Sequence, residues 1–408
     1  MAVNLVAPEA EKLLRVNGIR LATASAGIKK PGRHDVVLFE MVEGTQTAAV
    51  YTQNAFCAAP VILAKDHQSS SPSRFLLINS GNANAGTGEQ GLLAAKACCE
   101  AVADIAAVNA STVLPFSTGV IGQPLPVDKI VAVLPQAFDS LAADNWLAAA
   151  RGIMTTDTLP KAQSTQVNID GQLITITGIS KGSGMIRPDM ATMLAYIATD
   201  AAIEKPVLQD ILNSAMAESF NRITVDGDTS TNDACVLMAT GKAGNATVSD
   251  LNTVDGQNLL KAITDICRFL AQAIVRDGEG ATKFITINVE QGQTAEECRQ
   301  VAYTIAHSPL VKTALFASDP NWGRILAAVG RSGITDFDLS GVTIHIGDVC
   351  IVASGQPAED YTEKKGQQVM SESEVIISVS LGRGEAVDQV WTCDFSYDYV
   401  KINAEYRT

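Results

Sequence analysis

The feature that most constrains the fold of this 408-residue chain is a short apolar run at residues 193–198, which follows a segment rich in glycine. A run of this length and composition fits a central β-strand that is buried on both faces. Upstream, Gly182 and Gly184 permit a tight turn, and Pro188 disfavours helical conformation in the residue before it. We therefore expect a strand in the middle of a sheet, entered through a constrained loop.

Strand and helix patterns alternate along the remainder of the chain, and no internal repeat is present. Asp170-Gly171 and Gly347-Asp348 each separate two apolar alternations, which predicts hairpins over residues 166–179 and 342–353. The further strands predicted are extended backbone over 18–41, a strand over 113–121 that ends in a Ser-Thr-Gly loop, a strand over 284–289, and β-structure over 376–381 and 390–402. The predicted helices are a buried helix over 92–108, a helix from Pro206 to about 219, and a helix capped by Asp255 that stops at 277–278. The fold class predicted is α/β, with mixed sheets covered by helices.

Composition and charge exclude several classes of partner. The chain is 47% hydrophobic and 18% charged, as in a soluble globular protein, and its length predicts two or more packed units. A net charge of −14 argues against nucleic acids and anionic membranes. Glu9 and Glu11 interrupt the N-terminal apolar residues, and no apolar run is long enough to span a membrane, so we expect a cytoplasmic protein.

The usual cofactor motifs are missing. The sequence holds no P-loop, dinucleotide fingerprint, GxSxG elbow or HExxH motif, and its eight cysteines form no CxxC pair. The four histidines lack a metal-ligand spacing, so no metal site is expected. Residues 226–233, called here the Asp-Gly-Asp segment, contain the three acids Asp226, Asp228 and Asp233. The glycine of this segment is at the wrong position for a calcium-binding loop. A hydrogen-bonded turn near the functional site is the preferred interpretation of that segment.

Thr192 is the candidate nucleophile. A constrained loop can expose its hydroxyl beside the preceding carbonyl, so that the chain could cut itself between Ala191 and Thr192. The freed α-amino group has an ordinary pKa of roughly 7.7–8.0, which suits a general base. An Ala-Thr pair before a strand is most often only a strand start. The glycines, Pro188 and the positive charge of Lys181 favour the nucleophile.

A resemblance to a known family bears on this choice. Residues 181–194 read Lys-Gly-Ser-Gly-Met-Ile-Arg-Pro-Asp-Met-Ala-Thr-Met-Leu, which resembles the cleavage-site signature of the ornithine acetyltransferases, also called the glutamate N-acetyltransferases of arginine biosynthesis. Other segments that resemble this family are 153–158, 219–221, 226–233, 277–283, 319–324 and 402–408. The likeness runs from about residue 18 to the C-terminus.

The resemblance implies an N-terminal-nucleophile-like sandwich with a second, smaller α/β domain. It implies self-cleavage into an α chain of residues 1–191 and a β chain of residues 192–408, assembled as two copies of each. Thr192 would take the acetyl group from N-acetylornithine and pass it to glutamate in a ping-pong reaction, without a metal or prosthetic group. Some family members also use acetyl-CoA, and the motifs leave open whether this chain does.

The resemblance also assigns site residues. Thr118 and Gly119 would form the oxyanion hole, although Ser-Thr-Gly by itself is most often a turn. The substrate-binding residues carried over are Thr155, Lys181, Thr192, Glu279, Asn403 and Thr408. Lys181 suits a substrate α-carboxylate and Glu279 suits the ammonium group of N-acetylornithine. Roles for the last two residues predict an ordered C-terminus, which is unusual for a chain end.

Two other functions stay open. A self-processing amidohydrolase or aminopeptidase of related fold would pass the acyl group to water instead of to glutamate. An uncleaved, non-catalytic binding protein would keep the loop intact. The combination of Lys181 with Glu279 favours transfer between amino acids, and the presence of Thr192 with Thr118 and Gly119 favours catalysis.

Overall fold

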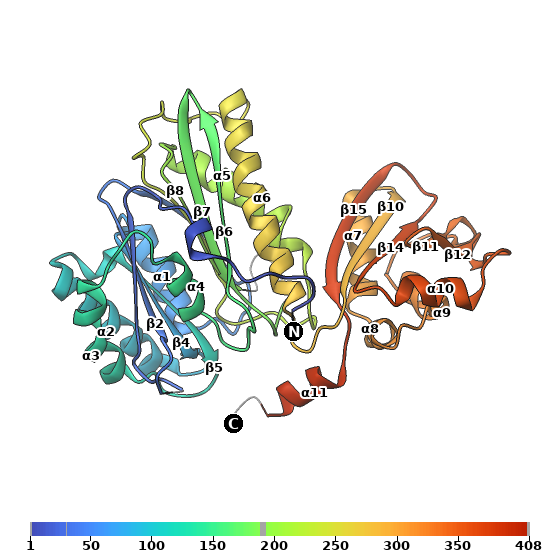
Figure 1. Ribbon diagram of the computed structural model, residues 1–408, viewed down its shortest axis with the longest axis horizontal. Coiled ribbons are helices and arrows are strands. Elements are labelled where there is room, and N and C mark those ends of the chain that lie inside the picture. The colour runs from blue at the N-terminus through green and yellow to red at the C-terminus, as the bar shows by residue number, and fades with distance from the viewer. Residues whose placement is uncertain (1, 30, 188–192, 406–408) are drawn as a thin grey trace.

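Two β-sheets stacked face to face form the larger of two lobes, and a third sheet forms the smaller lobe (Figure 1). The computed structural model describes residues 2–29, 31–187 and 193–405. Within these described ranges, no helix is both long enough and apolar enough to cross a membrane.

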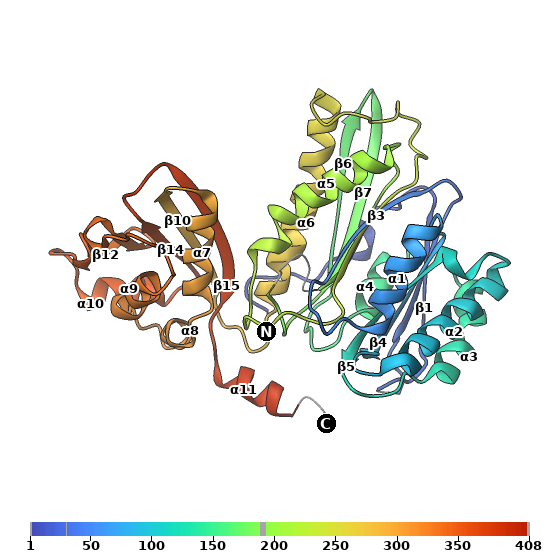
Figure 2. The same cartoon turned by 180° about the vertical axis from the view of Figure 1, so that it is seen from behind.

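The first sheet has the strand order β1–β2–β4–β5 and carries helices on its outer face (Figure 2). Its strands are β1 (Ile19–Ala24), β2 (Val36–Met41), β4 (Phe75–Asn82) and β5 (Val113–Val120). The elements that cover or flank it are α1 (Ala59–Ser70), α2 (Gly88–Ala106), η2 (Ala110–Thr112) and α3 (Val127–Asp139). The buried face of α2 consists mainly of alanine, cysteine and valine, and these small side chains let the helix lie close to the sheet.

The second sheet has the strand order β3–β9–β8–β7–β6 and packs its inner face on the first sheet. Its strands are β3 (Gln46–Tyr51), β6 (Lys161–Ile169), β7 (Gln172–Lys181), β8 (Leu194–Thr199) and β9 (Ala234–Ala239). The outer face is covered by α5 (Lys205–Ala217) and α6 (Val254–Arg276). Between the sheets, the Tyr196 ring lies 5.4 Å from the rings of both Phe39 and Phe116, near the helix α4 (Trp146–Gly152).

These layers, helix, sheet, sheet and helix, confirm the predicted sandwich. The central strand β8 is buried at all six positions, as expected for residues 193–198. It pairs antiparallel with β7 and parallel with β9, so that Lys181, Leu194 and Ala234 lie side by side at one end of the sheet. The chain therefore enters β8 beside the ends of its two neighbours.

The smaller lobe confirms the predicted second α/β unit. Its six-stranded sheet contains β10 (Phe284–Gly292), β11 (Thr343–Ile346), β12 (Val349–Ala353), β13 (Gln356–Pro357), β14 (Glu374–Ser380) and β15 (Ala386–Cys393). The helices are α7 (Ala295–Ala306), α8 (Pro309–Phe316), α9 (Trp322–Gly330) and α10 (Glu363–Met370). Short 3-10 turns are η1 (Ala10–Lys12) near the N-terminus and η4 (Leu339–Gly341) in this lobe. The last helix, α11 (Tyr397–Ala404), leaves this lobe and returns beneath the larger one (Figure 1).

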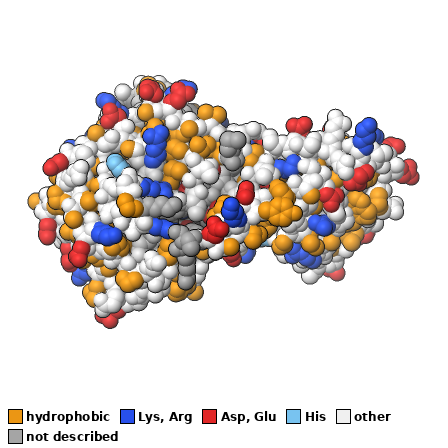
Figure 3. Space-filling view, turned by 60° about the horizontal axis from the view of Figure 1, so that its bottom comes forward, with side chains coloured by type: hydrophobic (Ala, Val, Ile, Leu, Met, Phe, Trp, Pro, Cys, Tyr) orange, Lys and Arg blue, Asp and Glu red, His pale blue; other side chains and the backbone are white. Residues whose placement is uncertain are grey.

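The turn η3 (Phe220–Arg222) and the residues after it join the lobes. Ile223 forms an isolated parallel bridge with Trp391 of β15, and the Arg222 guanidinium pairs with the buried Asp388 carboxylate of the same strand. Figure 3 views the molecule from the side on which α11 lies, and shows charged side chains of both signs at the waist between the lobes.

Both predicted hairpins are confirmed. Asp170 and Gly171 connect β6 to β7 with positive φ angles of 51° and 73°, as the favoured two-residue turn requires. The 342–353 hairpin is formed by β11 and β12. Pro206 lies in the first turn of α5, and α6 ends at Arg276 with Asp277 as its C-cap, as expected.

Three local predictions are wrong. Ser117, Thr118 and Gly119 do not form a loop, because β5 continues through them in parallel pairing with β4. Asp255 does not cap α6, because the Thr253 side chain accepts the hydrogen bond from Gly256 N at 3.0 Å and Asp255 lies inside the first turn. The tail after β15 is the helix α11, since Ser396 caps it and stops the strand pattern.

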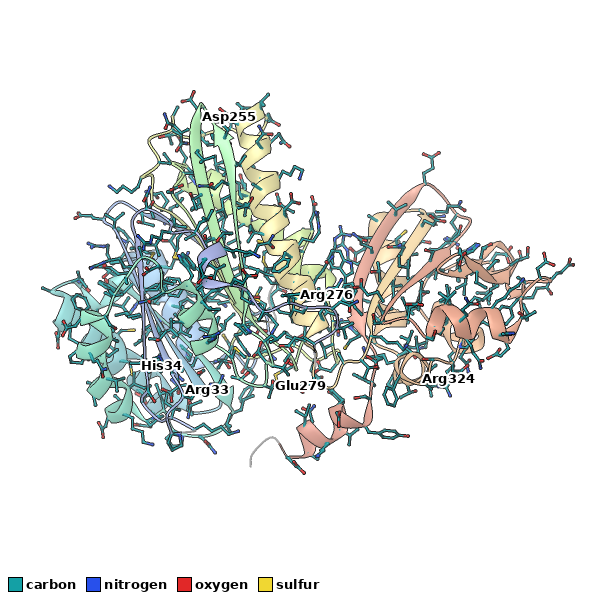
Figure 4. The ribbon with its side chains drawn as sticks, in the orientation of Figure 1. Arg33, His34, Asp255, Arg276, Glu279 and Arg324 are labelled. Atoms are coloured by element: carbon teal, nitrogen blue, oxygen red, sulfur yellow. The ribbon has the colours of Figure 1, made fainter. Side chains whose placement is uncertain are left out.

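The assignment of Thr253 as the N-cap of α6 can be tested by substitution. Thr253→Ala removes the capping oxygen, and we expect the free energy of unfolding to fall by about 1 kcal/mol. Asp255→Ala, at the position labelled in Figure 4, removes only a favourable charge near the helix N-terminus and should cost roughly 0.3 kcal/mol. Urea unfolding followed by circular dichroism compares the two variants. An equal or larger loss in Asp255→Ala would contradict the assignment of the cap.

Candidate active site

A cavity of about 260 Å³ lies where β5, β7 and α11 converge with the segment after α6. Its lining includes Thr118, Gly119, Thr155, Lys181, Glu279 and Asn403. These are all of the site residues expected from the sequence that the structure describes. Ala191, Thr192 and Thr408 lie outside the described residues. Segments far apart in the sequence therefore meet at one cavity.

The end of β5 supplies one wall of this cavity. The Thr118 hydroxyl accepts a hydrogen bond from the Lys181 ammonium at 3.1 Å, which leaves its own proton free to be donated elsewhere. Gly119 has a φ of 136°, and a Cβ there would lie 2.3 Å from the carbonyl carbon of Gly81. Only glycine fits this close approach of β5 to β4, where the register of the pair is irregular.

Glu279 supplies a buried carboxylate on another wall. It lies just after the end of α6, near α11, as Figure 4 shows. Its side chain accepts a hydrogen bond from Asn403 Nδ2 at 2.8 Å, and its backbone N–H donates to Ser183 O at 2.9 Å. Burial raises the pKa of Glu279, and the hydrogen bonds together with the nearby Lys181 ammonium only partly oppose that effect. A cation bound beside Glu279 would favour the ionised carboxylate and oppose the effect of burial.

A buried ion triad beneath the cavity fixes its loops. Lys161 at the start of β6 lies 2.7 Å from both the Asp157 and the Asp277 carboxylates, and none of the three side chains is more than 1% exposed. Asp157 also accepts hydrogen bonds from Thr155 N at 3.0 Å and Gly182 N at 2.8 Å. Burial opposes ionisation of Asp157, but Lys161, Lys181 and these hydrogen bonds outweigh it and hold its pKa below the ordinary range.

The triad connects three segments that line the site. Asp157 fixes the backbone at Thr155 and the backbone just after Lys181. Asp277, which Lys161 holds, lies two residues before Glu279 and so fixes the start of the segment that carries it. Sequence reasoning assigned no role to these residues. Two of them lie in the family-like segments 153–158 and 277–283, which was the available signal. No sequence signal marked Lys161.

The Asp-Gly-Asp segment holds the backbone beside the cavity. Asp226 accepts hydrogen bonds from Met185 N at 2.6 Å and Ile186 N at 2.9 Å. Asp226 also accepts a hydrogen bond from Asp228 N at 3.3 Å, which confirms the local hydrogen-bonded turn expected for that segment. Among the residues that the structure describes, no group of three or more His, Cys, Asp or Glu side chains is arranged to hold a metal ion.

A second cavity of about 280 Å³ adjoins the first. The two share the wall residues Gly119, Val120, Thr155 and Thr156. Arg33, labelled in Figure 4, lines this neighbour and donates hydrogen bonds to the carbonyls of Met154 and Thr155, the latter at 3.3 Å. Thr155, in the wall between the cavities, is therefore held by Arg33 through its carbonyl and by Asp157 through its N–H.

The helix–sheet–sheet–helix sandwich with a cavity at its strand ends has the layers expected of an N-terminal-nucleophile-like fold. The comparisons with known proteins agree. The ArgJ family model matches residues 20–408. The chain is similar to the arginine biosynthesis bifunctional protein ArgJ of Pseudomonas syringae pathovar tomato, with 58% identity over 96% of this chain and 97% of that protein.

Two solved structures are also similar. One is the arginine biosynthesis bifunctional protein ArgJ of Bacillus halodurans, with 42% identity over 50% of this chain and 95% of that chain, at a TM-score of 0.48. The other is an ornithine acetyltransferase complexed with ornithine from Mycobacterium tuberculosis, with 31% identity over 46% of this chain and 99% of that chain, at a TM-score of 0.40. The chain belongs to the ArgJ family, as its resemblance to the ornithine acetyltransferases predicted, and it is an enzyme.

The ion triad gives a second test. Lys161→Met leaves two buried carboxylates without their cation, and we expect the free energy of unfolding to fall by about 3–5 kcal/mol. The matched control is Lys261→Met, because Lys261 forms an exposed ion pair with Asp265 at 2.6 Å that should contribute about 0.5 kcal/mol or less. Chemical unfolding of both variants measures the difference. Similar losses in the two would contradict the importance of the triad.

Proposed function

We propose that this enzyme transfers the acetyl group of N2-acetylornithine to glutamate through an acetyl-Thr192 intermediate. The observation that carries the proposal is a single cavity in which the Lys181 ammonium, the Glu279 carboxylate and the Thr118–Gly119 wall lie together. An ammonium and a carboxylate suit an amino-acid substrate that carries both charges. The names of the curated relatives support a role in arginine biosynthesis.

The proposal includes self-cleavage between Ala191 and Thr192. The α chain, residues 1–191, would then supply Thr118, Gly119 and Lys181, and the β chain, residues 192–408, would supply Glu279 and Asn403. The two chains would remain together, because β7 of the first pairs with β8 of the second and β3 of the first pairs with β9 of the second. An assembly of two copies of each chain is part of the proposal and is supported by the family resemblance alone.

The proposed reaction has two symmetrical halves. The Thr192 hydroxyl attacks the acetyl carbonyl while the freed α-amino group takes its proton, and the C–N bond then breaks as the proton passes to the amine of ornithine. In the second half, the α-amine of glutamate attacks the acetyl ester and Thr192 regains its proton. The Thr118 hydroxyl and the Gly119 N–H would stabilise both tetrahedral intermediates, and in other enzymes one such donor contributes roughly 3–4 kcal/mol.

The remaining roles follow from charge. Lys181 would bind the substrate α-carboxylate and Glu279 the side-chain ammonium of the donor, with Thr155, Asn403 and Thr408 completing the pocket. The reaction as proposed needs no metal or prosthetic group. The word bifunctional in the relatives' names supports a second activity, which we propose is acetylation of glutamate with acetyl-CoA as co-substrate. The net charge of −14 favours small-molecule substrates over nucleic acids or membrane surfaces, and we propose a cytoplasmic location.

Self-cleavage is tested by the intact masses of the denatured protein. We expect two fragments, residues 1–191 and 192–408, in the wild type and in Thr192→Ser, which keeps a hydroxyl. Thr192→Ala removes the nucleophile, so it should give one uncut chain of 42.9 kDa. An uncut wild type would contradict the proposal and favour a binding protein. A cleaved enzyme that releases acetate from N-acetylornithine but does not acetylate glutamate would be a hydrolase.

The raised pKa of Glu279 predicts how donor binding depends on pH. As pH falls through this pKa the carboxylate gains a proton and loses its attraction for the donor ammonium, so KM for N-acetylornithine should rise as the pH is lowered, beginning at a higher pH than an ordinary glutamate carboxyl would give. Among the described residues, the nearby charges that shift this pKa are those of Asp226, which raises it, and Lys181, which lowers it. In Glu279→Gln, KM should be high and nearly independent of pH. A wild-type pH dependence that persists in Glu279→Gln would contradict this role.

A further inference from the structure

Asn232, which lines the first cavity, is a buried residue that the proposed reaction does not use. Its Nδ2 donates two hydrogen bonds, to Ala83 O at 2.6 Å and to Ser117 O at 3.0 Å. Its Oδ1 accepts a hydrogen bond from the Thr231 hydroxyl at 2.6 Å. The amide nitrogen thus faces two acceptors and the amide oxygen faces a donor, so the orientation of the side-chain amide is fixed.

Both carbonyls bonded by Asn232 are connected to the backbone of the Thr118–Gly119 wall. Ser117 O belongs to the same peptide group as the Thr118 N–H. Ala83 N donates to Val120 O at 3.0 Å, so Ala83 is tied to the residue that follows Gly119. One side-chain amide thus holds the backbone before Thr118 directly and the backbone after Gly119 through a single intermediate residue.

The hydrogen bonds of Asn232 also join the two halves of the chain. Ala83, Ser117 and Val120 belong to residues 1–191, whereas Asn232 belongs to residues 192–408. Asn232 immediately precedes Asp233 and Ala234, and Ala234 N donates to Met193 O at 2.9 Å. The segment that carries Asn232 is therefore bonded both to the oxyanion wall and to the first described residue of the second half.

We propose that Asn232 is a positioning residue that holds the Thr118–Gly119 wall of the first half at a fixed distance from the start of the second half. The inference rests on the proposed function, because it gives that wall the role of an oxyanion hole. Hydrogen-bond donors stabilise a transition state only when they are aimed at the developing charge. A misplacement of about 1 Å can reduce the rate about 100-fold. Losing the amide should therefore slow the chemical step and leave substrate binding nearly unchanged.

The test compares Asn232→Ala and Asn232→Asp with a matched control, Asn245→Ala. Asn245 is also a buried asparagine, and it links Ala202 to Ala246 with hydrogen bonds of 2.9, 3.3 and 2.7 Å in the larger lobe, with no residue of the cavity among its partners. We expect kcat of both Asn232 variants to fall about 100-fold with KM changed about twofold or less. Asn245→Ala should lose a comparable amount of thermal stability and keep its kcat.

A milder variant, Thr231→Val, keeps the test informative if the Asn232 variants do not fold. Thr231→Val removes the donor to Asn232 Oδ1 and leaves both carbonyl contacts in place, so it should lower kcat by about 10-fold with KM unchanged. The inference is overturned if processed Asn232 variants keep wild-type kcat or lose no more than Asn245→Ala. If the Asn232 variants do not fold, an unchanged kcat in Thr231→Val overturns it. A wild type that neither cleaves nor transfers acetyl would instead overturn the proposed function.

Discussion

The candidate active-site cavity depends on the buried interaction of Lys161 with Asp157 and Asp277. Removing three charges from water is costly, and the cost is recovered only because each carboxylate also accepts backbone hydrogen bonds. Those hydrogen bonds fix the segments that carry Thr155, Lys181 and Glu279. The same network therefore supports the fold and sets the spacing between the charged side chains Lys181 and Glu279 that line the cavity. Because Lys161 supplies a single positive charge for two acids, Lys181 nearby completes the electrostatic balance.

A second constraint is that the site is assembled from both halves of the chain. Strand β8 begins the second half and lies between β7 and β9, so cutting the loop before it leaves the sheet intact. Helix α11 returns from the smaller lobe, and Asn403 on it bonds Glu279. The smaller lobe thus contributes to the cavity, although its own core is separate. This arrangement explains how a processed protein could keep a rigid active site.

Much of this could be predicted from the sequence, and the failures have physical causes. The central strand and the hairpins follow from local apolar patterns and turn residues. The family resemblance, and no local pattern, selected Thr118, Lys181, Glu279 and Asn403, which line one cavity. The ion triad was missed because Lys161 and Asp277 are 116 residues apart, and only tertiary folding brings them together. The cap of α6 was misplaced because threonine and aspartate two residues apart are both good caps, and the backbone conformation decides between them. The helix after β15 was missed because its two tyrosines, its valine and its isoleucine also suit a strand.

The central claim is that the N-terminal threonine of the second half carries the acetyl group between two amino acids. The most direct measurement is an acid-quenched intact-mass spectrum of the processed enzyme after incubation with N-acetylornithine in the absence of glutamate. The account predicts one acetyl group on the 192–408 chain, located at Thr192 by peptide mapping and removed when glutamate is added. No acetyl adduct in a fully active enzyme, or an adduct on another residue, would contradict the account.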